Sequence, residues 1–148
     1  MGFLPGGASE KLGNRFEELW VAKQLVFLLN EQIRTVQIEA VGDDEEGVDV
    51  WVTRLDGSRE AQQCKAFNKS KSNWSLADLM DRGVLPKAIG QLERDQSVSF
   101  QFVSTILATE LEDLSRNARE FGAIRNSSFG IALTALHESR NLMSFADC

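Results

Sequence analysis

The feature that most constrains this chain is an Asp56-Gly57 pair between two alternating segments. Residues 48–54 (VDVWVTR) and 59–67 (REAQQCKAF) show the period-two alternation of strands, and the first is also rich in β-branched residues. An Asp-Gly pair favours a two-residue hairpin turn, because both central turn residues need positive φ. The sequence therefore predicts two antiparallel neighbouring strands joined by a tight turn.

The rest of the chain alternates between helical and strand patterns. Apolar residues recur every three or four positions from Ser9, a candidate N-cap, to Asn30. The remaining predictions are strands at 34–40 and 99–106, helices at 75–81, from Pro86 to Asp95, at 110–121 with Gly122 as the stop, and at 127–145. This order predicts an α/β fold in layers, with a mixed sheet flanked by helices.

The 148 residues are expected to form a single domain, residues 1–148, because this length is typical of one hydrophobic core. The chain stops at SFADC without a tapering tail, so we expect it to be a fragment of a longer multidomain chain. The helix expected within 127–148 would then lead to the next domain.

Composition limits the partners. The net charge is −6 and the pI is about 4.8, which argues against bulk electrostatic binding of nucleic acid, so any phosphate contact must be local. Two cysteines are too few for a disulfide scaffold and indicate a cytoplasmic location. No apolar run reaches the ~18 residues of a membrane span, and no G-x-x-x-x-G-K phosphate-binding loop is present.

Three polar residues converge at one end of the predicted hairpin. Gln63 and Lys65 lie two apart on one strand and so face the same side, whereas Cys64 faces the other. Counting back through a two-residue turn pairs Val50 with Gln63 and places Asp49 opposite Cys64. Asp49 then lies between Gln63 and Lys65.

The chemistry of these groups suits a hard divalent cation, Mg²⁺ with Mn²⁺ as a substitute. Such an ion takes oxygen ligands, and the candidates are the Asp49 carboxylate, the Gln63 amide oxygen and the Cys64 backbone carbonyl. Lys65 could orient or deprotonate an attacking water and offset charge in a phosphoryl transition state. Lys69 and Lys71, just beyond it, could contact phosphates or simply solubilise a loop.

The segments FEELW (16–20), GDDEEGVDVWV (42–52) and QCKAF (63–67) together resemble the Mrr-like restriction endonuclease branch of the PD-(D/E)xK nuclease superfamily. The match covers residues 13–67 in order and spacing. The resemblance implies a restriction-endonuclease-like fold and metal-dependent hydrolysis of double-stranded DNA. It also implies a role as effector in bacterial antiviral defence, fused to a sensor or NTPase domain.

By this resemblance, Asp49 is the metal-binding aspartate, Gln63 replaces the more usual carboxylate, and Lys65 is the catalytic lysine. Glu17, on the first helix, would complete the metal shell, with its neighbour Glu18 as the alternative. Cutting both strands of a duplex with one site per chain would favour a homo-oligomer.

Several competing interpretations remain open at this stage. From spacing alone, Glu17 is a solvated helix residue, and Cys64 is a buried small apolar residue rather than a reactive thiol. Gln91 is a further candidate for the site. The whole domain could be a non-catalytic binding or oligomerisation module, or a nuclease acting on RNA or branched DNA.

Overall fold

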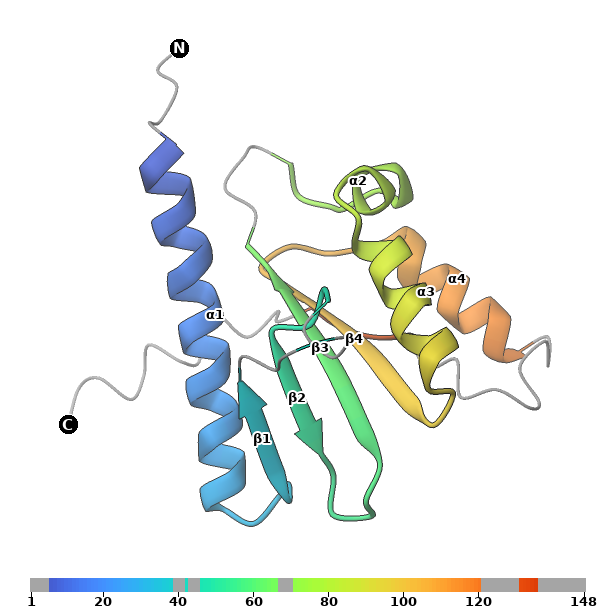
Figure 1. Ribbon diagram of the computed structural model, residues 1–148. Helices are drawn as coiled ribbons and strands as arrows, with labels where there is room; N and C mark the ends of the chain where they lie inside the picture. The colour runs from blue at the N-terminus through green and yellow to red at the C-terminus, as the bar shows by residue number, and fades with distance from the viewer. Residues whose placement is uncertain (1–5, 39–41, 43–45, 67–70, 121–130, 136–148) are drawn as a thin grey trace.

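A computed structural model describes residues 6–38, 42, 46–66, 71–120 and 131–135 (Figure 1). Helix α1 (Gly6–Leu29) is followed by strands β1 (Thr35–Ile38), β2 (Val50–Thr53) and β3 (Arg59–Lys65). The elements after β3 are α2 (Leu76–Asp81), α3 (Val84–Arg94), β4 (Val98–Ser104), α4 (Thr109–Glu120) and β5 (Ile131–Ala135).

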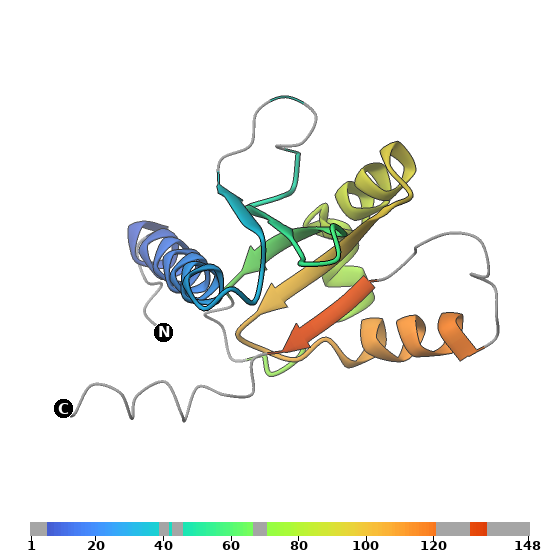
Figure 2. The ribbon, with the colours of Figure 1, turned by 90° about the horizontal axis from the view of Figure 1, so that it is seen from below.

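The five strands form one mixed sheet in the order β1-β2-β3-β4-β5. The pairs β1–β2 and β2–β3 are antiparallel, whereas β3–β4 and β4–β5 are parallel. Helix α1 lies on one side of the sheet, and α2, α3 and α4 lie on the other (Figures 1 and 2). The predicted α/β fold with a mixed, helix-flanked sheet is thereby confirmed.

Each face of the sheet has its own apolar core. The face under α1 buries one cluster, composed of Trp20, Ile33, Val50, Val52, Cys64 and Val103. The opposite face packs against α3 through Val48, Trp51, Ala61, Ala88, Leu92, Val98 and Phe100. A third cluster joins α2, α3 and α4 to β4 through Trp74, Leu79, Val84, Phe102, Ala108 and Leu111. Because neighbouring strand residues serve opposite cores, β2, β3 and β4 are buried on both faces.

The hairpin exists, but its predicted register was wrong by one residue. Val50 pairs with Gln62 rather than Gln63, and Trp51 pairs with Ala61. The reason lies in the loop: the Arg54 N–H donates to the Ser58 carbonyl at 2.8 Å, so three residues, 55–57, make the connection instead of two. Gly57 supplies the positive φ of +90° that such a loop needs at its last position.

The helix predicted over 127–145 was also wrong where the structure describes it. Residues Ile131–Ala135 form strand β5, which pairs in parallel with Phe100–Ser104 of β4. A short, mostly apolar segment of five residues is compatible with either a strand or a helix. Here the edge of β4 offers backbone hydrogen-bonding partners, which stabilise the strand. The remainder of 127–145, and the expected helix stop at Gly122, lie outside the described residues.

The other predicted elements are confirmed with small shifts. Helix α1 begins at Gly6, so Ser9 lies inside the helix and is not its N-cap. Helix α3 begins at Val84, which leaves Pro86 in the first turn, where a missing N–H costs nothing. Ser75 caps α2 through a reciprocal capping box with Asp78.

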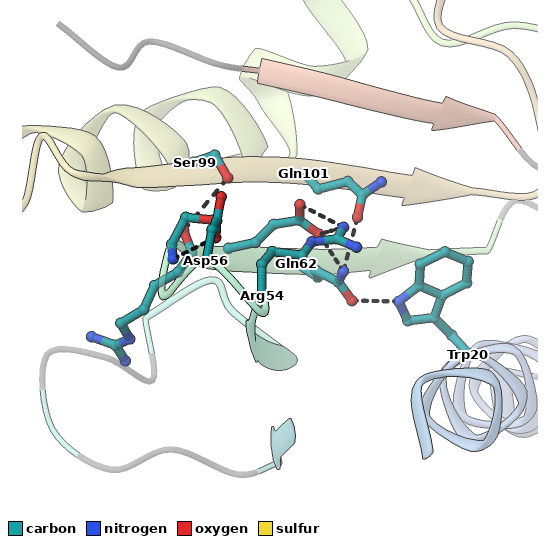
Figure 3. A network of polar contacts seen from close by, with 9 residues as sticks. Trp20, Arg54, Asp56, Gln62, Ser99 and Gln101 are labelled. Atoms are coloured by element: carbon teal, nitrogen blue, oxygen red, sulfur yellow. Dashed lines mark hydrogen bonds and ion pairs between the residues drawn. The ribbon is translucent and has the colours of Figure 1, made fainter. Parts of the chain in front are cut away.

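Buried Gln62 ties α1 to the centre of the sheet. Its side-chain oxygen accepts a 2.7 Å hydrogen bond from Trp20 Nε1, and its amide nitrogen donates to Gln101 Oε1 at 2.9 Å (Figure 3). The same nitrogen donates to Glu60, which forms an ion pair with Arg54. Every polar atom of the buried Gln62 side chain is therefore hydrogen-bonded, as burial requires.

Candidate functional site

Strand β3 places alternate side chains on the two faces of the sheet. Gln62 and Cys64 face α1, where Cys64 joins the apolar cluster that contains Trp20. Ala61 belongs to the opposite cluster with Ala88 of α3, so Gln63 and Lys65, at spacings of two, project to that same side. The predicted separation of Gln63 and Lys65 from Cys64 is confirmed.

Asp49 lies directly before β2 and reaches β3 with its side chain. Its backbone N–H donates to the Gln62 carbonyl at 2.9 Å, and its Oδ2 accepts a 2.6 Å hydrogen bond from the Cys64 N–H. The predicted proximity of Asp49 to Cys64 is thus correct, although the carboxylate and not the backbone register brings it about. Since Cys64 separates Gln63 from Lys65, the carboxylate sits beside both.

The environment of Asp49 is only partly favourable to its negative charge. Burial raises the pKa of this carboxyl above its ordinary value, while the Cys64 hydrogen bond and the charges of Lys65 and Lys87 act in the opposite direction. A cation bound beside this half-buried carboxylate would therefore stabilise its negative charge.

Gln63 carries an unsatisfied oxygen. The residue is only 2% exposed, and its Oε1 has no hydrogen-bond partner among the residues that the structure describes. A buried, unpaired carbonyl oxygen costs roughly 1–3 kcal/mol. Its position one residue from the Asp49 contact makes it a candidate ligand oxygen.

The Cys64 carbonyl is positioned to join them. In an extended strand, the N–H and C=O of one residue project to the same edge, and the Cys64 N–H points to Asp49. The Cys64 thiol, by contrast, is buried on the far face, and burial raises its pKa strongly, with smaller contributions from Asp49 and Glu17. The thiol is therefore a core group, as the sequence interpretation had it.

Glu17 lies on α1 and acts on β3 through its charge. It contributes to the raised pKa of the Cys64 thiol, which stands one residue before the end of β3. Glu17 and Glu18 both line an open groove along α1, with Val21, Leu25 and Ile38 among the other lining residues. Glu17 is the less exposed of the two and the one with influence on β3. Within the described ranges, no three His, Cys, Asp or Glu side chains come together as a metal-binding group.

The other predicted residues have mixed outcomes. Lys69 lies outside the described residues, and Lys71 forms a 2.9 Å ion pair with Asp78 of α2, which gives it a structural role. Gln91 is buried, and its Nε2 donates to the Glu46 carbonyl at 3.0 Å. It therefore holds the segment before β2 against α3. Lys87, on the same helix, acts on the Asp49 charge, and no sequence pattern singled it out because a lone helix lysine is ordinarily a solvated residue.

Comparison with known proteins identifies no relative. A scan against protein-family models, a search of curated proteins and a search of solved structures all ended without a match. In the part of the chain that the structure describes, no helix has the length and apolar character needed to cross a membrane.

Proposed function

We propose that this domain is a magnesium-dependent endonuclease of restriction-endonuclease-like fold that hydrolyses phosphodiester bonds of double-stranded DNA in bacterial antiviral defence. The observation that carries the proposal is the unpaired, buried Oε1 of Gln63 next to the Asp49 carboxylate and Lys65. Natural proteins rarely keep such an orphaned oxygen without a use, because removing it would stabilise the fold.

The residues present fit a hard divalent cation. Asp49 Oδ2 is engaged by Cys64, which leaves Oδ1 for a ligand, and Gln63 Oε1 and the Cys64 carbonyl add two neutral oxygens. One carboxylate with carbonyl oxygens and water is the donor set that Mg²⁺ prefers. When bound, Mg²⁺ would supply Lewis-acid stabilisation of the charge that develops on the phosphate oxygens.

The protein's own groups would do the remaining work. Lys65 projects from the same face as Gln63, so its ammonium can hold a water molecule for attack on phosphorus or neutralise a phosphate oxygen. Glu17 would act on the metal shell through water. The net charge of −6 makes local cations necessary for DNA to approach at all, and Lys65 is one of them.

Plasmid cleavage at low salt tests the proposal. Wild-type protein with Mg²⁺ should cut the plasmid. EDTA should abolish cutting, and the Lys65→Ala substitution should lower the cleavage rate by roughly 10²-fold or more. Arg116→Ala, which removes one exposed cation on α4 that pairs with Asp113, is the matched control and should cut normally. A folded wild-type protein that binds Mg²⁺ without cutting plasmid would instead favour RNA or branched DNA as substrate. Absence of both Mg²⁺ binding and cleavage would favour a non-catalytic module.

A further inference from the structure

Gly47 lies where helix α3 crosses the segment that leads into β2. Its φ is +72°, a conformation that favours glycine. A Cβ at this position would lie 2.6 Å from Lys87 Cβ and 2.7 Å from Lys87 Cδ. The aliphatic stem of Lys87 therefore runs directly over the Gly47 backbone, two residues before Asp49.

Two further contacts fix the same junction. Gln91 Nε2 donates to the Glu46 carbonyl at 3.0 Å, and Arg94 lies 3.6 Å from the Glu46 carboxylate. Val48, the next residue but one, is buried against Ala88 and Leu92 of α3. The helix and the entry to β2 thus pack as one unit, and the position of the Lys87 stem is set by that packing.

The charge of Lys87 faces the same group as the charge of Lys65. Burial is the main influence on Asp49 and raises its pKa, but Lys65 and Lys87 are the two cations that lower it. Lys87 is exposed at its end, whereas its stem is held by Gly47. Lys65 of β3 and Lys87 of α3 therefore both act on the Asp49 charge, and the Gly47 contact places the Lys87 stem two residues from it in the chain.

We propose that Lys87 is a second phosphate-binding residue of this site, with its stem held over Gly47, two residues before Asp49. The inference rests on the proposed nuclease function and names a further residue of the same site. A single Asp49 charge does not need two lysines, whereas each phosphodiester of a bound DNA strand brings one further negative charge close to the protein, so that successive phosphates call for more than one cation. Lys87 would bind a phosphate oxygen as a mobile point charge.

Lys87→Met tests this assignment, because methionine keeps the unbranched stem over Gly47 and removes only the charge. Arg116→Met is the matched control, because it removes one exposed cation that pairs with Asp113 on α4 and takes no part in the Gly47 junction. Lys87→Arg restores the charge. All three proteins should unfold at temperatures close to that of the wild type, as checked by circular dichroism.

Two measurements are made on each protein. In steady-state DNA cleavage, Lys87→Met should lower kcat/KM by about tenfold or more, mainly through KM, whereas Arg116→Met should change it by about twofold or less. In calorimetric titration with MgCl₂ and no DNA, Lys87→Met should bind Mg²⁺ more tightly, by about three- to tenfold, because a like charge next to the ion is gone. A purely structural lysine would not produce that gain. Lys87→Arg should resemble the wild type in both assays.

The outcomes separate the two proposals. A wild-type protein that cuts and binds Mg²⁺, with Lys87→Met equal to Arg116→Met in both assays, would overturn the role of Lys87 alone. Loss of Mg²⁺ affinity in Lys87→Met would also overturn it, since the lysine would then support the ion instead of opposing it. A wild-type protein that neither cuts nor binds Mg²⁺ would overturn the nuclease proposal and this inference together.

Discussion

Two neighbouring glutamines on β3, Gln62 and Gln63, allow a direct test of whether the buried, unpaired oxygen of Gln63 destabilises the fold. Gln62 and Gln63 have the same side chain, are 1% and 2% exposed, and point to opposite faces. Gln62 is fully hydrogen-bonded, whereas Gln63 Oε1 has no partner in the described part of the chain. Replacing each by methionine, which has a similar length and no hydrogen-bonding amide, should therefore have opposite effects.

The magnitudes follow from the contacts. Gln63→Met removes a buried unpaired oxygen and should raise the free energy of unfolding by about 1–2 kcal/mol in the absence of metal. Gln62→Met leaves the Trp20 N–H and the Gln101 oxygen without their partner, and should lower it by about 2–5 kcal/mol. At this chain length 1 kcal/mol corresponds to about 2–4 °C in Tm, so the two variants, about 3–7 kcal/mol apart, should differ by roughly 6–28 °C.

Urea denaturation and differential scanning calorimetry in EDTA measure the change in stability of each variant. The same measurements in MgCl₂ show whether Gln63 contributes to metal binding. Wild-type protein should gain stability with Mg²⁺ concentration, as expected when a ligand binds the native state alone, and Gln63→Met should gain less. Equal destabilisation by both substitutions would refute the reasoning, because it would mean that Gln63 is already satisfied. A Gln63→Met protein that responds to Mg²⁺ like the wild type would remove Gln63 from the ligand set.

Two other predictions concern Asp49 and Trp20. Burial raises the pKa of the Asp49 carboxyl in the native state, so the native state holds the carboxyl proton more tightly than the unfolded chain does. Without metal, the free energy of unfolding should therefore fall as the pH rises from the pKa of Asp49 in the unfolded chain through its higher pKa in the native state. Urea titrations at several pH values should show this dependence, and Asp49→Asn should flatten it. Mg²⁺ should compete with the same proton, so the Mg²⁺-induced rise in Tm should shrink as the pH is lowered from 7 toward ~4 in the wild type. Trp20→Phe keeps the ring in the core but loses the 2.7 Å hydrogen bond to Gln62, and should cost about 1–3 kcal/mol in urea denaturation; a cost near zero would mean that Gln62 finds another donor.

Much of the fold followed from periodicity and turn chemistry. The alternation of β2 and β3 is a strong pattern, and Gln63 and Lys65 fell on one face because a strand alternates whatever its exact register. The spacing of apolar residues identified α1 as a helix but not its buried face, because Leu19, Val26 and Leu29 are exposed. The register itself was beyond the sequence, because an Asp-Gly pair fits both a two-residue and a three-residue loop. Only the Arg54–Ser58 hydrogen bond distinguishes them.

The parts of the site that escaped sequence reasoning depend on tertiary packing. No local pattern marks Lys87, because its significance comes from the absent Cβ of Gly47, forty residues earlier in the chain. The buried hydrogen-bonding role of Gln62 on β3 was also not predicted. Gln62 looks like a surface residue in the sequence, yet it is buried, because Trp20 and Gln101 supply the hydrogen bonds that make its burial tolerable.

The interleaving of two roles along β3 has a consequence for how this gene can vary. Substitutions at the exposed Leu55 leave both faces of the strand in place and should accumulate freely, whereas Gly57 is held by the positive φ of the loop. Loss or gain of one codon within 59–65 would instead exchange the faces and carry Cys64 toward α3 and Lys65 into the core beneath α1. Functional descendants of this chain should therefore carry substitutions along β3 but no insertions or deletions, so that the strand aligns without gaps.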